Sequence, residues 1–191
     1  MYNKCYSMNT AKIVTKDITQ LKVSVGHYEN RDYEWDGRFT FDVLTTPIEV
    51  KAKEAKVRRV LERLNDDITW PEAPTYEDVL EMVEFGSQCW ILMYEDLACG
   101  WYWLNTEQVT KDFKSPGQKL KPHEVYLGTG TVSRKDKKVV NASQIAFRQA
   151  IELGLRYNRK EVAYLYCDNW NHWSIKLCKG SGMYEHKFID E

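Results

Sequence analysis

A strand–helix–strand unit in the second half of the chain restricts the fold most strongly. Residues 124–132 have the pattern of an apolar strand, 141–157 that of an amphipathic helix, and 161–167 that of a second strand. Two strands joined through a helix pair in parallel with a right-handed crossover. A hairpin over 89–94 and 99–104 comes before this unit and adds antiparallel pairing. The sequence therefore predicts an α/β fold whose mixed, mostly antiparallel sheet carries helices on both faces.

Shorter patterns flank this unit on both sides. Alternating apolar residues predict strands over 38–44 and 184–189. Apolar residues at helical spacing predict helices over 49–64 and 75–86, the second of which opens with a capping box. A further short helix is predicted over 173–179. The order is therefore helix, helix, hairpin, strand, helix, strand, helix, strand.

Length and composition indicate one globular domain. The 191 residues suffice for one domain with a core and are few for two. Contents of 43% hydrophobic and 29% charged residues are ordinary for such a domain. Residues 1–38 are mostly polar, with one short apolar stretch at 21–25. We interpret 39–191 as the domain and 1–38 as an N-terminal extension of unknown role.

Charge and cysteine usage restrict the class of protein further. A formal net charge of −1 provides no global basic field for nucleic acid. The five cysteines are odd in number and have no Cys-x-x-Cys spacing, so we expect free thiols and no metal site. The sequence has neither an apolar run long enough to span a membrane nor an apolar signal core, and we therefore expect a cytoplasmic location.

The segment 162–183 contains a strand, a turn, a short helix and a glycine stop. Four residues carry its motif: Asn171, Ser174, Leu177 and Gly182. Their spacing resembles the last third of the GNAT superfamily of CoA-dependent N-acyltransferases, and the order of elements over 39–189 is similar as well. The chain departs from the motif in Met183, where phenylalanine is usual, and in Cys178, where tyrosine is usual. The resemblance implies a GNAT-like domain over 39–191.

The same resemblance implies acetyl-CoA as a co-substrate. In GNAT proteins, a basic, glycine-containing turn before the helix holds the CoA pyrophosphate with its backbone N–H groups. The matching residues here are Lys137, Lys138, Val140, Asn141 and Ala142. A β-branched valine replaces the first glycine of that turn and adds bulk. A solvated basic surface loop is the alternative interpretation of this run.

The resemblance also places the rest of the donor. The backbone around Val132 would hold the thioester by strand-like pairing, and Asn171 and Ser174 would lie beside the pantetheine arm. An asparagine in a turn-rich segment serves equally well as a plain helix cap. Both interpretations of Asn171 stay open from the sequence.

Three residues are candidates for the chemistry. Glu124, at the start of a predicted strand, is our first choice for the base that accepts the amine proton. Cys178 occupies the position of the family's tyrosine, which protonates the leaving thiolate, and is either a weaker acid or inert. Tyr184 is close in sequence and is the candidate substitute for that tyrosine.

An aromatic set on the antiparallel half suggests where the acceptor binds. Trp101, Trp103 and Tyr126 lie on predicted strands, and such side chains suit an aromatic or nucleobase acceptor by stacking. Core packing is the alternative for each of them. The predicted loop over 106–122 is long for a compact domain and is a second candidate region for acceptor recognition.

Together these patterns predict transfer of an acetyl group from acetyl-CoA to a primary amine by direct attack. One rival is a catalytically inactive member that keeps the fold as a binding or assembly module, which Val140 and Cys178 favour. Another is a phage-type enzyme that modifies nucleic-acid bases. The sequence leaves the acceptor and the oligomeric state open, a dimer included.

Overall fold

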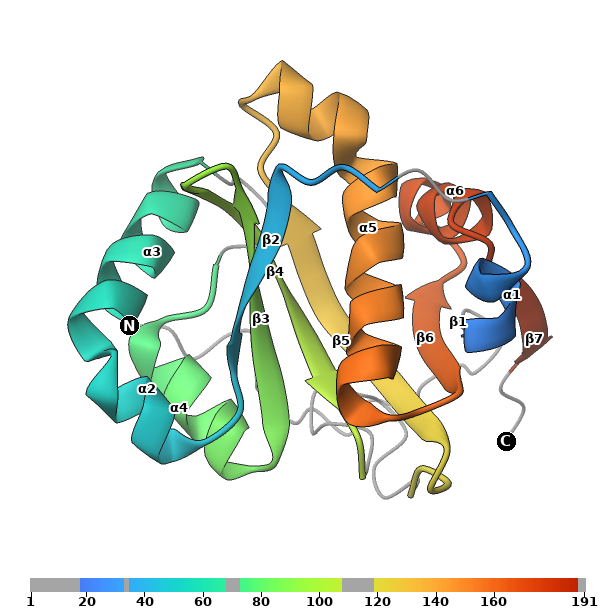
Figure 1. The fold of residues 1–191 in the computed structure, drawn as a ribbon, viewed down its shortest axis with the longest axis horizontal. Helices are drawn as coiled ribbons and strands as arrows, with labels where there is room; N and C mark the ends of the chain where they lie inside the picture. Colours follow the sequence, from blue (N-terminus) through green and yellow to red (C-terminus); the bar gives the residue numbers. More distant parts are fainter. Residues whose placement is uncertain (1–17, 33–34, 68–72, 108–118, 189–191) are drawn as a thin grey trace.

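The computed structural model describes residues 18–32, 35–67, 73–107 and 119–188. These residues form a seven-stranded sheet with strand order β2-β3-β4-β5-β6-β1-β7 (Figure 1). The strands are β1 (Ile18–Ser24), β2 (Phe39–Leu44), β3 (Ser87–Tyr94), β4 (Leu97–Asn105), β5 (Glu124–Val132), β6 (Val162–Asp168) and β7 (Tyr184–Phe188). The helices are α1 (Val25–Glu29), α2 (Pro47–Ala52), α3 (Glu54–Asp67), α4 (Tyr76–Glu84), α5 (Lys137–Asn158) and α6 (His172–Gly180).

The sheet is mixed, as predicted. β5 and β6 pair in parallel, and the chain between them runs through α5. The other neighbouring strands of the described sheet pair antiparallel. The predicted α/β class with a mostly antiparallel sheet is therefore confirmed.

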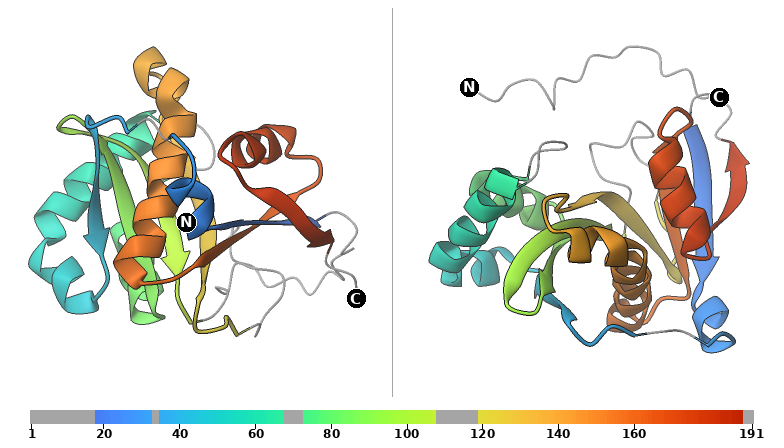
Figure 2. Two further views of the ribbon diagram at one scale, coloured as in Figure 1. Left: turned by 45° about the vertical axis from the view of Figure 1, so that its right-hand side comes forward. Right: turned by 90° about the horizontal axis from the view of Figure 1, so that it is seen from above.

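Helices cover the two faces of the sheet over different strands. α2, α3 and α4 pack beside β2 to β4, and α5 lies on the opposite face together with α1 and α6 (Figures 1 and 2). Each face has its own apolar core. Trp101 and Trp103 belong to the core under α2 to α4. Tyr102, between them in sequence, belongs to the core under α5, because successive strand residues point to opposite faces.

The predicted boundary at residue 39 does not match the sheet. β1 lies inside the segment 1–38 that we interpreted as an extension, yet it is inserted between β6 and β7. Leu21 pairs with Leu165 on one side and Glu185 on the other, and its side chain is fully buried. Residues 1–17 lie outside the described part of the chain. The part of the extension that the structure describes is therefore integral to the domain.

Several helix boundaries differ from the predicted ones. The helix predicted over 49–64 is two helices, since α2 ends at Ala52 and α3 begins at Glu54. The helix predicted from 141 begins earlier, at Lys137, because the Asp136 side chain accepts a hydrogen bond from the backbone N–H of Lys138 at 2.7 Å. An aspartate at this position is a strong helix start.

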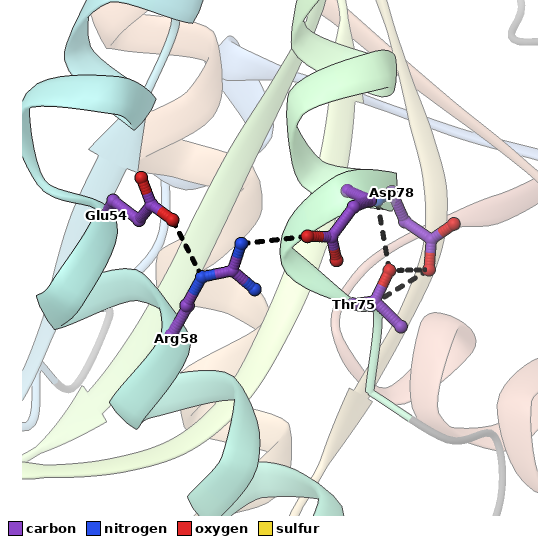
Figure 3. A network of polar contacts seen from close by, with 5 residues as sticks. Glu54, Arg58, Thr75 and Asp78 are labelled. Carbon is purple, nitrogen blue, oxygen red and sulfur yellow. Dashed lines mark hydrogen bonds and ion pairs between the residues drawn. The ribbon is translucent and has the colours of Figure 1, made fainter.

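The α3–α4 side of the molecule is joined by exposed polar contacts (Figure 3). Arg58 donates to Glu54 at 2.9 Å and to Glu77 at 2.8 Å, which links the two helices. Thr75 and Asp78 form the predicted capping box at the start of α4. These contacts fix the orientation of α3 and α4, which close one face of β3 and β4.

Candidate active site

β5 and β6 separate partway along their length. Their parallel register runs from Glu124 opposite Val162 to Leu127 opposite Leu165 and ends there. Beyond this point β5 still pairs with β4, as far as Val132. The edge of β5 that faces β6 over 128–132 therefore has no ladder partner among the described residues.

A bulge in the β4–β5 ladder accompanies the separation. The register shifts between Tyr102 and Leu104 of β4, opposite the two glycines of β5. A Cβ atom on Gly128 would lie 3.0 Å from Trp103 Cβ, and one on Gly130 would lie 2.5 Å from Tyr102 Cδ1. Two glycines within one strand indicate a bulge or a close approach of backbone, and both are found here. Because a bulge bends its strand, β5 follows β4 and moves away from β6.

A cavity of about 570 Å³ opens where the two strands part. Its walls come from β5 and the residues that follow it, from the first turns of α5, and from α6. Five of the predicted site residues line it: Val132, Val140, Asn141, Ser174 and Cys178. The sequence-based site and this cavity thus coincide in part.

α6 is fixed against the rest of the domain at its C-terminal end. The carbonyl oxygen of Gly180 accepts hydrogen bonds from Arg148, at 2.5 Å, and from Gln144, both on α5. The hydroxyl of Tyr28 on α1 donates to the Ser181 carbonyl at 3.1 Å. Because these carbonyls would otherwise lack partners, the bonds hold α6 at a set distance from α5. The cavity between the two helices is therefore preformed.

Asn171 caps α6. Its side-chain Oδ1 accepts a hydrogen bond from the Ser174 backbone N–H at 3.2 Å. Asn171 is not among the described residues that line the cavity, whereas Ser174 is. Of the two interpretations of Asn171, the structure shows the helix cap.

Tyr102 places a buried hydroxyl group at the cavity. Its side chain lines the cavity and is only 5% exposed. The hydroxyl oxygen has no hydrogen-bond partner within the described residues. Burial raises the pKa of this phenol far above its usual range, so the group stays protonated. A buried donor without a partner costs stability, which suits a group that meets a ligand.

Cys178 is a neutral thiol in the cavity wall. It lines the cavity, is 1% exposed, and burial raises its pKa to about 12. The thiolate is the nucleophilic form of cysteine, and a pKa this high keeps it scarce at neutral pH. A covalent role for Cys178 is therefore disfavoured.

The predicted phosphate turn is helical. Residues 137–142 form the first turns of α5, and the Val140 N–H already donates to the Asp136 carbonyl at 2.9 Å. Lys137, Lys138 and Ala142 are not among the described residues that line the cavity. The expected glycine-like turn before the helix is therefore replaced by an aspartate cap, which occupies the Lys138 N–H and starts the helix early.

Glu124 lies at the other end of β5, on the other face of the sheet. It accepts hydrogen bonds from the Tyr164 hydroxyl at 3.1 Å and from the Lys121 N–H at 2.9 Å. The strand rise places it about 13 Å before Gly128, where the cavity begins. Burial, followed by the bond to Glu124, raises the pKa of Tyr164 to about 12. Glu124 and the cavity are therefore not in direct contact.

The other predicted site residues are also apart from the cavity. Trp101 and Trp103 are buried in the core under α2 to α4, so for them the core interpretation is the one that the structure shows. Tyr126 is buried, with its ring 5.6 Å from that of Tyr166. Tyr184 on β7 is 53% exposed and its ring stacks with Lys22.

Sequence reasoning found Val140 on the cavity face of α5 but missed Gln144 and Phe147 on the same face. Val140, Gln144 and Phe147 all line the cavity and follow one another at helical spacing. That spacing was available in the sequence once the helix start was placed at Asp136. The sequence did not show which face of the sheet Tyr102 occupies, because that depends on the register of the hairpin.

Two kinds of site are not seen among the described residues. No group of three or more His, Cys, Asp or Glu side chains there is arranged to hold a metal ion. None of the described helices combines the length and apolar character needed to cross a bilayer. The four cysteines of this part of the chain (Cys89, Cys99, Cys167 and Cys178) are free and buried.

Comparisons with known proteins support the fold. No protein-family model and no curated protein matches the sequence. A GCN5-related N-acetyltransferase from Sphaerobacter thermophilus matches over 88% of this chain and 48% of its own, with 12% identity and a TM-score of 0.51. A tandem GNAT protein from the clavulanic acid biosynthesis pathway, solved without AcCoA, matches over 88% of this chain and 50% of its own, with 10% identity and a TM-score of 0.54.

A conserved protein of unknown function from Staphylococcus epidermidis matches in the same way, with 7% identity, a TM-score of 0.52, and 57% of its length covered. The chain thus spans about half the length of these solved structures. The protein has the fold of the GCN5-related N-acetyltransferase superfamily. The strand separation and its cavity lie within that fold.

Proposed function

We propose that the protein transfers an acyl group from a thioester, acetyl-CoA in the simplest case, to a primary amine. The observation that carries this proposal is the cavity at the β5–β6 separation, with an unpaired strand edge on one wall and an unpartnered phenol on another. An extended chain that contains amides pairs with such an edge as an added strand. The pantetheine arm of a thioester donor has this chemistry.

The thioester is proposed to lie against β5 between Gly130 and Val132. Backbone groups of this edge would hold the amides of the arm, and the apolar side chains of Phe147 and Leu177 would enclose it. Ser174 contributes a hydroxyl group to the same wall. The site is thus mostly apolar with a few polar groups, which is typical of small-molecule sites.

The reaction forms one bond and breaks one. The amine nitrogen bonds to the acyl carbon, the carbon–sulfur bond breaks, and an amide and a thiol result. The amine loses one proton and the sulfur gains one. We propose that the Tyr102 hydroxyl donates a hydrogen bond to the leaving sulfur, because it is protonated and has no partner within the described residues, and that water supplies the proton that the thiolate takes up.

The amine proton is proposed to pass to solvent water, since Glu124, the predicted base, lies about 13 Å before the cavity and on the other face of the sheet. Cys178 is assigned to the cavity wall, because its thiol stays neutral. Tyr184 is given no role in the transfer, since it is exposed on β7 and is not among the described lining residues.

Thermal unfolding with and without acetyl-CoA tests the proposal. At a hundred times its dissociation constant, the donor should stabilise the fold by about 2.7 kcal/mol, a rise in Tm of roughly 5–10 °C. Ser174→Trp fills the cavity mouth and should abolish the shift. Ser24→Trp is the matched control, because Ser24 is exposed at the end of β1 and caps nothing with its side chain.

Release of free thiol in the presence of a panel of primary amines then tests the transfer itself. If neither acetyl-CoA nor a shorter acetyl thioester shifts the Tm, the transferase proposal is wrong. The aspartate cap of α5 and the neutral Cys178 favour a second function in that case, a binding module that keeps the fold without the chemistry.

A further inference from the structure

The N-terminus of α5 already carries an anion. The side-chain carboxylate of Asp136 accepts a hydrogen bond from the Lys138 N–H at 2.7 Å. The backbone carbonyl of Asp136 accepts one from the Val140 N–H at 2.9 Å. A helix N-terminus stabilises negative charge, and here the chain itself supplies that charge. A pyrophosphate at the same place would have to approach a carboxylate at close range, and like charges repel.

Val140 also fills the space that a phosphate would need. It lines the cavity and is 40% exposed, so its side chain stands at the rim instead of in the core. Close approach of a phosphate to backbone requires glycine or a comparably open position. At the start of α5 the Lys138 N–H is thus already bonded, and a valine side chain stands where a phosphate would need an open position.

Two cations line the cavity at other points. Arg134 follows β5, and Lys176 lies on α6, so they come from different walls of the cavity. Neither forms an ion pair with another described residue, and Lys176 lies 5.9 Å from the centre of the Trp173 ring. Lys135, by contrast, donates to the Asp66 carbonyl on α3 and does not line the cavity. Two cations that line one cavity from different elements suit one phosphate group.

Building on the function proposed above, we propose that the donor is recognised as a phosphopantetheine thioester. The β5 edge binds the pantetheine arm, Arg134 and Lys176 bind its one phosphate, and the adenosine nucleotide part of CoA adds no affinity. Such a donor is a carrier-protein-bound or free acyl-phosphopantetheine, or the corresponding half of acyl-CoA.

Calorimetric titration with three truncated donors tests this inference. Acetyl-phosphopantetheine should bind the full chain within about threefold of acetyl-CoA, and acetyl-pantetheine, which lacks the phosphate, about tenfold more weakly. Acetyl-CoA binding more than tenfold tighter than acetyl-phosphopantetheine would overturn the inference and leave the proposed transferase intact. Failure of all three to bind would instead overturn the proposed function.

Variants locate the phosphate. Lys176→Gln and Arg134→Gln should each weaken acetyl-phosphopantetheine about tenfold and leave acetyl-pantetheine unchanged. Lys179→Gln is the control on the same helix, since Lys179 pairs with Glu185 and does not line the cavity. Equal losses for both donors, or an equal loss in the control, would contradict a phosphate site at these cations.

A cap variant tests the repulsion directly. Asp136→Asn keeps a good helix cap and removes the charge, so acetyl-CoA should gain about threefold in affinity while acetyl-pantetheine stays unchanged. No gain would show that Asp136 does not exclude the nucleotide. An acetylated bacterial acyl carrier protein distinguishes the sources: binding tighter than that of acetyl-phosphopantetheine identifies the carrier-bound donor, and weaker binding the free one.

Discussion

The two edges of β5 differ in how far they are used. On the β4 side the ladder continues to Val132, held close by glycines that leave no room for a side chain. On the β6 side the ladder ends at Leu127, although both strands continue. Over residues 128–132, β5 is therefore hydrogen-bonded to a neighbouring described strand along its β4 edge only. Because the tight edge bends the strand, the packing with β4 is what opens the site with β6.

Gly130→Ala should break this arrangement most severely. The new Cβ would lie 2.5 Å from Tyr102 Cδ1 and 2.7 Å from the Trp101 carbonyl oxygen, which is backbone and cannot turn aside. We expect a loss of about 3 kcal/mol in the free energy of unfolding, measured by chemical denaturation. Gly37→Ala is the control, since no atom lies within 4 Å of its added Cβ. Similar losses in the two variants would show that the close contact does not hold β5.

Tyr102→Phe should change stability in the opposite direction to Gly130→Ala. Removing a buried hydroxyl that lacks a partner should stabilise the free protein by about 1 kcal/mol while weakening thiol release from a bound donor. Tyr28→Phe is the matched control, because that hydroxyl donates to Ser181 at 3.1 Å and its removal should destabilise by a similar amount. Destabilisation by Tyr102→Phe would mean that the hydroxyl is satisfied in the free protein.

Two buried thiols allow the access of water to the closed core and to the cavity to be compared. Burial raises the pKa of Cys89, in the closed core, and of Cys178, at the cavity, to about 12. A pKa raised on folding gives stability that is complete below the unfolded value, about 8.5, and is lost as pH rises toward 12. Cys89→Ala and Cys178→Ala should each reduce that loss by roughly 1 kcal/mol per pH unit above pH 9, measured by denaturation at several pH values. A clearly smaller effect for Cys178 would show that water reaches the cavity thiol.

Local patterns predicted the elements better than their arrangement. β5 was predicted with its observed bounds, because an apolar run and two glycines mark it within its own sequence. The place of β1 was not predictable in this way. A short apolar stretch near the N-terminus carries no signal that it will pair with β6 and β7, which are remote in sequence.

The site was predicted in part for the same reason. Cys178 and Ser174 were found through the resemblance of segment 162–183 to the GNAT motif, and both line the cavity. For Trp101 and Trp103 the core alternative is the one observed. Alternation shows that Tyr102 faces away from these two residues, but it does not show which face of the sheet holds the cavity. Asp136 was a readable helix start, and recognising it would have placed residues 137–142 in α5.

The position of β1 also makes the covalent order of the chain differ from the spatial order of its sheet. The Thr19 hydroxyl donates to Asn169 at 2.5 Å across 150 residues of chain. During synthesis, the wait between the completion of β1 and that of its partner strands therefore covers nearly the whole domain. At 5–20 residues per second that wait is roughly 10–30 s. Thr19 pairs with Phe188 at the end of β7, so a short hairpin turn suffices to join β7 to β1. A circular permutant with that turn, opened between α1 and β2, would exchange the longest-range contact of the sheet for a local one and should refold faster than the natural order.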